Sequence, residues 1–138
     1  MTAKFFDIFS RTHEIIKKDL LIQKVEVDYR EKNSMVPSLL KKLGLDVEFK
    51  ELKIADYIVK DIAIERKTIS DFINSMINRR LLKQLEELQQ YKNKILIIEG
   101  FEEQELYNDN ESNGINPNSI RGFILSILLK HKIPIIFT

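Results

Sequence analysis

The feature that most constrains the fold is a pair of apolar runs, 54–59 and 62–67, separated by only two residues. A connection that short joins antiparallel strands, so the spacing predicts a β-hairpin. Symmetric pairing about its turn places Asp56 directly opposite Glu65. Lys67 lies two residues beyond Glu65 and shares its face, because side chains alternate along a strand. The hairpin therefore predicts two acids and one lysine on one face of a sheet.

Helices and further strands alternate on both sides of this hairpin. The apolar spacing predicts helices at 4–21, 37–43, 72–77, 81–91 and 120–129, strands at 25–28, 45–49, 95–98 and 133–137, and polar loops at 30–34 and 101–119. The strands predicted at 95–98 and 133–137 alternate with helices, which implies parallel pairing, whereas the hairpin is antiparallel. The sequence therefore predicts an α/β fold with a mixed central sheet flanked by helices.

Composition narrows the classes of function. The 138 residues include 22 basic and 21 acidic ones, a formal net charge of +1, so any nucleic-acid binding must lie in a local site. The absence of cysteine excludes disulfides, thiolate metal sites and cysteine nucleophiles. No apolar stretch has the length of a membrane span, and the start lacks a signal-peptide core. We therefore expect a single intracellular domain with no membrane partner.

The predicted pair of Asp56 and Glu65 is unfavourable by itself, because like charges directly opposed across strands repel. A bound cation compensates the repulsion, and oxygen ligands suit Mg²⁺ or Mn²⁺, which also take waters and substrate phosphate oxygens. A solvated ladder of ion pairs is the competing interpretation. The apolar neighbours Ile54, Ile58 and Ile64 favour a functional site, because burying acids without a ligand is costly. The pattern is typical of phosphodiester hydrolysis.

Three motifs follow one another along the chain. The first motif is a D-x-R-E element formed by Asp28, Arg30 and Glu31. The second consists of Ala55-Asp56, then Glu65-Arg66-Lys67, and then Asp71. The third is an R-L-x-x-Q-x-x-x-L run that contains Arg80, Gln84 and Leu88. Together they resemble the first strand, the G-D-X(n)-E-R-K-X(3)-D signature and the following run of XPF-type structure-selective DNA endonucleases, within the PD-(D/E)XK superfamily. Ala55 stands where that signature has glycine.

This resemblance implies a restriction-endonuclease-like fold, with residues 1–24 as an amphipathic helical extension and 25–138 as the nuclease domain. It implies Mg²⁺- or Mn²⁺-dependent cleavage of flaps, forks or splayed arms in branched DNA, during DNA repair or replication-fork processing. The family's helix-hairpin-helix domain is missing from this sequence. We therefore expect a homodimer, or a heterodimer with a subunit that carries this domain, and the family also allows a sliding clamp as a partner. The implied location is the cytoplasm, nucleoid or nucleus.

The resemblance also implies roles for individual side chains. Asp56 and Glu65, with Asp28 as a further carboxylate, are expected to hold the metal. Lys67 is expected to orient the attacking water or to stabilise the transition state. A second group is expected to bind DNA or support the site: Arg30, Glu31, Arg66, Asp71, Arg80 and Gln84.

Several roles stay open at this point. For Arg66 we favour an ion pair with Asp71. Arg80 either contacts a phosphate of the scissile strand or ties the two helices to the active-site strand. Asp28 and Glu31 either bind a second metal or position Arg30. The apolar stripe at 123–128 is expected to be core, with a dimer interface nearby. A Holliday-junction resolvase and a noncatalytic nuclease-like scaffold are the alternative functions.

Overall fold

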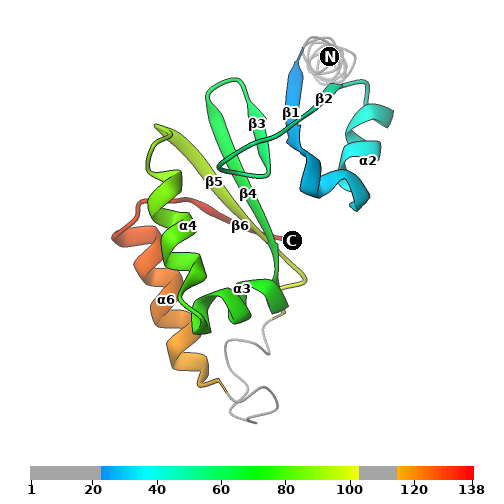
Figure 1. Cartoon of the computed structure of the whole chain (residues 1–138). Helices are drawn as coiled ribbons and strands as arrows, with labels where there is room; N and C mark the ends of the chain where they lie inside the picture. The colour runs from blue at the N-terminus through cyan, green and yellow to red at the C-terminus, as the bar shows by residue number, and fades with distance from the viewer. Residues whose placement is uncertain (1–22, 103–114) are drawn as a thin grey trace, which may run out of the picture. The chain divides into compact units, whose positions relative to one another are not determined.

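The computed structural model describes residues 23–102 and 115–138 (Figure 1). The chain divides into two compact units, an N-terminal unit of residues 1–52 and a C-terminal unit of residues 53–138. The helix predicted at 4–21 and most of the loop predicted at 101–119 lie outside the described residues. Within the described residues, no helix is both long enough and apolar enough to cross a membrane.

The N-terminal unit contains two parallel strands. Strand β1 (Lys24–Asp28) pairs with β2 (Asp46–Lys50), and between them the chain forms a 3-10 helix, η1 (Tyr29–Asn33), and helix α2 (Val36–Lys42). Helix α2 has Pro37 in its first turn, as the sequence predicted, and Gly44 follows its end with a φ of 86°.

The polar segment predicted as a loop at 30–34 is largely η1 instead. The reason is a side-chain cap, because the carboxylate of Asp28 accepts a hydrogen bond from the backbone N–H of Arg30 and so closes the first turn.

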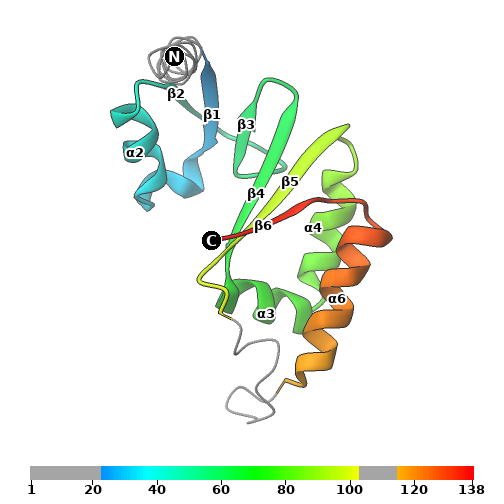
Figure 2. The same cartoon turned by 180° about the vertical axis from the view of Figure 1, so that it is seen from behind.

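The C-terminal unit is built on a mixed sheet. Its strands are β3 (Tyr57–Val59), β4 (Ile62–Thr68), β5 (Asn93–Glu99) and β6 (Ile135–Phe137), in the spatial order β3-β4-β5-β6. The β3–β4 pair is antiparallel, whereas β4–β5 and β5–β6 are parallel. The helices are α3 (Ile69–Ile77), α4 (Arg80–Leu88) and α6 (Pro117–Leu129), and α4 and α6 lie side by side against the sheet (Figures 1 and 2). These elements confirm the predicted mixed α/β architecture.

The hydrophobic core lies between this sheet and its helices. Burial alternates along strand β4: Ala63, Glu65 and Lys67 are buried, and the residues between them are partly exposed. The core also contains Leu96 and Ile98 of β5, together with Phe72, Leu81, Leu85, Leu88, Ile120, Ile127 and Ile133. Because Glu65 and Lys67 have the same parity as Ala63, the sheet holds both charged side chains on its core face.

The start of strand β3 differs from the sequence prediction. The strand expected from 54 begins only at Tyr57, because Ala55 adopts a left-handed conformation with a φ of 70°. A strand cannot continue through that conformation, so the preceding segment turns away from the ladder. The connection expected near residues 78–80 is confirmed, with Arg79 left-handed at a φ of 59° between α3 and α4.

Candidate active site

The β3–β4 hairpin has the register that its two-residue turn predicts. Tyr57 pairs with Ile64, and the two pairs nearer the turn follow the same register. Asp56 lies just beyond the last pair. Its backbone N–H donates to the carbonyl of Ile64 at 3.0 Å, and its Oδ2 accepts from the backbone N–H of Arg66 at 2.9 Å. Asp56 is thus bonded to the residues on both sides of Glu65, which brings the two acids to neighbouring positions across the strands.

Glu65 is held by two donors on its Oε1 atom. The Nζ of Lys67 lies 3.3 Å away, and the Nε2 of Gln84 donates a hydrogen bond at 3.0 Å. All three predicted central residues are buried, with relative exposures of 8% for Asp56, 6% for Glu65 and 7% for Lys67. A solvated ladder is therefore wrong, because these charges are removed from water and engaged by fixed donors.

Gln84 has a more direct place than the sequence indicated. Helix α4 brings its side chain onto Glu65, and its own Oε1 is buried with no hydrogen-bond partner in the described part of the chain. A buried acceptor without a partner normally receives a hydrogen bond from ordered water. The Gln84 carbonyl therefore offers a hydrogen-bond acceptor next to Glu65.

Arg66 points to the other face of β4, as predicted, but the ion pair that we favoured with Asp71 is wrong. The guanidinium binds Glu99 of β5 through two contacts, Nε to Oε1 at 2.5 Å and Nη2 to Oε2 at 2.6 Å. The physical reason is register, because Arg66 stands beside Ile97 in the parallel β4–β5 ladder and Glu99 follows two residues later on the same face. Arg66 thus ties β4 to β5 behind the acids.

Arg80 links helix α4 to helix α3, while a tie from these helices to the active-site strand, one of its two predicted roles, stays a prediction. Its Nη2 donates to the Oγ of Ser75 at 3.1 Å, and that hydroxyl donates to the carbonyl of Asp71 at 2.5 Å. Asp71 itself lies in the first turn of α3, where its backbone N–H donates to Oγ1 of the capping residue Thr68. A carboxylate at that position is favourable at a helix N-terminus.

Asp28 lies in the N-terminal unit, where it is 2% exposed. Its Oδ1 accepts from the Nε of Arg30 at 2.6 Å, and its Oδ2 accepts from the backbone N–H of Leu52 at 2.7 Å. Burial raises the pKa of the Asp28 carboxyl, but the hydrogen bonds and charge of Arg30 and the bond from Leu52 outweigh it, so the pKa lies below its ordinary value. Asp28 therefore positions Arg30, one of the predicted alternatives, while its role as a metal ligand stays a prediction.

Glu31 lies in the first turn of η1 and is partly buried. Its predicted role in metal binding is untested by these contacts.

The donor set fits a hard divalent cation. No group of three or more His, Asp or Glu side chains placed to hold a metal occurs within residues 23–102 and 115–138. Asp56 and Glu65 nevertheless supply two buried carboxylates, and Mg²⁺ ordinarily uses one or two such ligands and keeps several waters. The unpartnered Oε1 of Gln84 gives one of those waters an acceptor.

Three supporting residues were not found from the sequence: Glu99, Ser75 and the backbone of Leu52. Each partners a residue from another element. The sequence pointed to Glu99 in one way, because this residue follows an apolar run that was expected to be a buried strand. The register that pairs it with Arg66 is visible only in the folded sheet.

Comparison with known proteins agrees with this geometry. The model of the ERCC4 domain matches residues 27–138. A candidate ATP-dependent RNA helicase of Methanocaldococcus jannaschii is 41% identical over 116 residues, which cover 83% of this chain and 13% of that protein. The 3′-flap repair endonuclease Xpf of Saccharolobus solfataricus is 40% identical over 82 residues, which cover 58% of this chain and 35% of that protein.

The solved structure of XPF from Aeropyrum pernix in complex with DNA has a TM-score of 0.73 and 36% identity to this chain. The match covers 84% of this chain and 56% of that one. The chain thus spans well under two thirds of the length of each of these proteins. The family match over most of the sequence, together with the shared fold, shows that the chain belongs to the ERCC4-domain family and has an XPF-type nuclease domain.

Proposed function

We propose that this domain is a metal-dependent, structure-selective DNA endonuclease that cleaves flaps, forks or splayed arms in DNA repair or replication-fork processing. The observation that carries the proposal is the buried set of Asp56, Glu65 and Lys67, with Gln84 bonded to Glu65. A domain with a purely structural role has no physical need for two buried acids on adjacent strands. Family membership supports the same reaction class.

Charge balance supports a metal ion at this site. Asp56, Glu65 and Lys67 carry a formal charge of −1 in a region removed from water, so a divalent cation together with one phosphate group of the substrate would make the site neutral. Asp56 and Glu65 would hold Mg²⁺ or Mn²⁺, with Asp28 proposed as a further carboxylate. When bound, the ion would act as a Lewis acid, favouring ionisation of the attacking water and neutralising charge on the phosphate.

The remaining side chains orient the reacting groups. The Nζ of Lys67 is held 3.3 Å from Glu65, so its positive charge is fixed beside the proposed metal position. An ammonium there would hold the attacking water or stabilise negative charge that develops on the phosphate oxygens. Gln84 fixes the orientation of the Glu65 carboxylate through its amide N–H and is a positioning residue. Arg66 and Arg80 stabilise the framework through Glu99 and Ser75.

We also propose that the domain works as a dimer on branched DNA inside the cell, with itself or with a subunit that carries a helix-hairpin-helix domain. The stripe at 123–128 that we expected to be core is so only in part, because Ile127 is fully buried whereas Leu128 is exposed. Leu125, Leu128 and Leu129 of the same helix are exposed by 54%, 40% and 74% and offer an apolar surface for a partner. We expect sedimentation at micromolar concentration to show a dimer; a fully active monomer would contradict the pairing.

The deciding experiment incubates labelled flap, fork and four-way-junction DNA with the purified chain, with and without Mg²⁺. We expect cleavage of flaps or forks that requires the metal and is lost in Glu65→Gln. The matched control is Glu86→Gln, which removes the same charge from an exposed position on α4. Preferred cleavage of the four-way junction would indicate a resolvase. Absence of cleavage at every substrate, with the fold intact, would indicate the scaffold.

A further inference from the structure

Ala55, the residue before Asp56, has a backbone conformation that alanine seldom adopts. Its φ is 70°, in the left-handed region, where the Cβ atom lies close to the following carbonyl oxygen and raises the energy. A residue stays in such a conformation only when its surroundings hold it there, and conformations of this kind are concentrated at functional sites. The surroundings of Ala55 therefore hold the backbone in a conformation that the residue by itself would leave.

The methyl group of Ala55 supplies one of the constraints. Ala55 is 3% exposed and belongs to the hydrophobic core cluster, and the preceding residue Ile54 packs against that cluster. Close packing around a buried methyl group leaves the backbone that carries it little room to rotate. The left-handed region open to alanine is also narrow, whereas glycine populates both positive and negative φ readily. Packing and stereochemistry thus confine residue 55 to one orientation.

This orientation determines where Asp56 meets strand β4. The left-handed residue directs the backbone N–H of Asp56 onto the carbonyl of Ile64 at 3.0 Å, and the Oδ2 of Asp56 accepts from the backbone N–H of Arg66 at 2.9 Å. Asp56 lies beyond the last paired residue of strand β3, so no strand continues through Ala55 to support it from the other side. The direction of the Asp56 carboxylate therefore depends on the conformation of residue 55.

We propose that Ala55 is a positioning residue, whose left-handed conformation and buried methyl group fix the Asp56 carboxylate in the place where it binds the divalent cation. The inference rests on the proposed function and deepens it, because it assigns the geometry of one metal ligand to the residue before it. A ligand that is ordered before the ion arrives loses less conformational freedom on binding, so the ion binds more tightly. Stability and metal affinity should therefore respond in opposite directions when Ala55 is changed.

The test replaces Ala55 by glycine, which adopts the same φ without strain but lacks the methyl group and has a wider range of accessible conformations. Binding of Mn²⁺ to the full chain is measured by titration calorimetry without DNA. We expect Ala55→Gly to weaken binding about tenfold, the lower end of the loss typical when a residue that orients a metal ligand is changed. Thermal melting without metal should show that the variant is at least as stable as the unsubstituted chain. A merely structural role of Ala55 would not separate these two quantities.

The matched control is Lys60→Gly in the turn of the same hairpin. Lys60 is exposed and also left-handed, with a φ of 56°, so glycine relieves the same kind of strain at the other end of β3 from Asp56. Titration at about 0.15 M salt screens the charge that this substitution removes. We expect Lys60→Gly to bind Mn²⁺ with unchanged affinity. An equal loss of affinity in Lys60→Gly would overturn the proposal, because the effect would then belong to the hairpin as a whole.

Amide hydrogen exchange reports the position of Asp56 without any metal. The backbone N–H of Arg66 is bonded to the Asp56 carboxylate, so its exchange should become about tenfold faster in Ala55→Gly than in the unsubstituted chain. The backbone N–H of Leu96 donates to the carbonyl of Pro134, outside this contact, and serves as the reference. Unchanged exchange at Arg66, or unchanged Mn²⁺ affinity in a chain that binds the ion, would overturn the proposal.

The proposed function is judged separately, by cleavage of forks with Mg²⁺ and by the Mn²⁺ affinity of the unsubstituted chain. A chain that binds no Mn²⁺ and cleaves no fork would refute the proposed function, even if exchange at Arg66 shows that Ala55 holds the Asp56 carboxylate. Metal-dependent cleavage together with an unchanged Mn²⁺ affinity in Ala55→Gly would refute the role of Ala55 alone.

Discussion

Replacing each of the two buried acids by its amide separates their structural roles. The Oδ2 of Asp56 accepts a hydrogen bond from the backbone N–H of Arg66. An asparagine carbonyl can accept the same bond, and the substitution removes one of two neighbouring negative charges. Glu65 differs, because its Oε1 is the acceptor for the ammonium of Lys67 as well as for Gln84. The Glu65→Gln substitution therefore leaves a buried lysine without its ion-pair partner.

The structure sets the size of the expected effects. The side chains of Glu65 and Lys67 are 8% and 7% exposed, and breaking a buried pair by removing one partner costs about 3–5 kcal/mol. A glutamine carbonyl still accepts a hydrogen bond from the ammonium, so we expect a smaller loss for Glu65→Gln, about 2 kcal/mol. For a domain of this size the melting temperature should fall by about 6 °C. For Asp56→Asn we expect no loss, or a gain of less than about 1 kcal/mol.

The assay combines thermal melting without metal, melting with Mn²⁺, and single-turnover cleavage of a fork. Both variants should lose at least about 100-fold in cleavage rate, and the stabilisation by Mn²⁺ should shrink in both. Only Glu65→Gln should melt lower in the absence of metal. The reasoning is refuted if the two variants have the same stability, if Asp56→Asn retains cleavage, or if the shift caused by Mn²⁺ is unchanged in both.

Three further experiments probe the supporting framework. A double-mutant cycle with Arg66→Ala and Glu99→Ala, measured by denaturant unfolding, should give a coupling energy of about 1–2 kcal/mol. The reason is that the ion pair is bidentate and largely shielded from solvent. A coupling energy near zero would contradict this expectation. Ala55→Gly should raise stability by about 0.5–1 kcal/mol, since glycine adopts a φ of 70° without strain; a lower melting temperature would count against it. Asp28→Asn should destabilise the chain at pH 7, as measured by urea unfolding across pH. The pKa of Asp28 is lower in the folded state than in the unfolded state, where it is near 3.8. The ionised carboxylate therefore contributes to the free energy of unfolding above the unfolded-state pKa, and this contribution is lost as the pH falls through the folded-state pKa. A stability difference between Asp28→Asn and the unsubstituted chain that stays constant from pH 7 to pH 3 would refute the assignment.

Much of the candidate site was predictable because the rules that place it act over a few residues. The two-residue turn sets the pairing of Tyr57 with Ile64, and strand alternation then puts Glu65 and Lys67 on one face and Arg66 on the other. Pro37 and Gly44 likewise mark the ends of α2 through their own backbone preferences. These features follow from the local chain, whatever surrounds it.

The partners of these side chains were decided by the tertiary structure. Glu65 receives Gln84 because α4 packs against the sheet, and Arg66 meets Glu99 because β4 and β5 align in one parallel register. The Glu65–Gln84 contact joins residues 19 positions apart in the sequence, and the Arg66–Glu99 contact joins residues 33 positions apart. The left-handed conformation of Ala55 also depends on the fold, since alanine seldom adopts a positive φ and the apolar pattern predicted a strand there.

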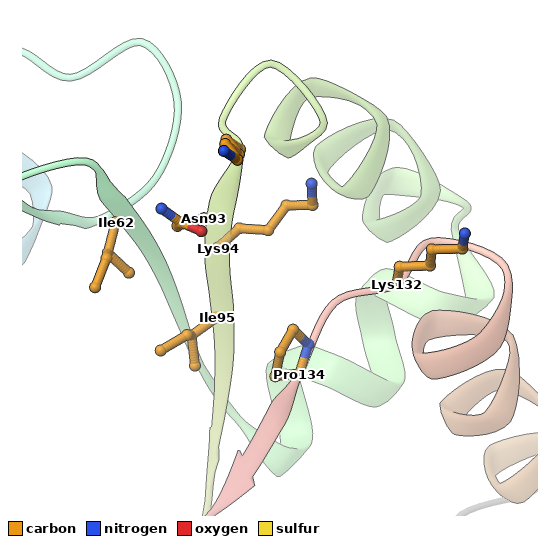
Figure 3. Close-up of a pocket in the computed structure, with 7 residues that line it drawn as sticks. Ile62, Asn93, Lys94, Ile95, Lys132 and Pro134 are labelled. Carbon is orange, nitrogen blue, oxygen red and sulfur yellow. The ribbon is translucent and has the colours of Figure 1, made fainter.

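The sequence by itself therefore determined which chemical groups stand on the active face of the hairpin, because periodicity and turn length are properties of neighbouring residues. Only the tertiary structure decided which donors hold the acids and where a pocket lined by Lys92, Lys94 and Lys132 opens (Figure 3). The physical reason is that Lys92, Lys94 and Lys132 come from two separate segments, which the parallel alignment of β5 and β6 brings to one end of the sheet. Such a meeting depends on strand order and packing, which no local pattern of residues encodes.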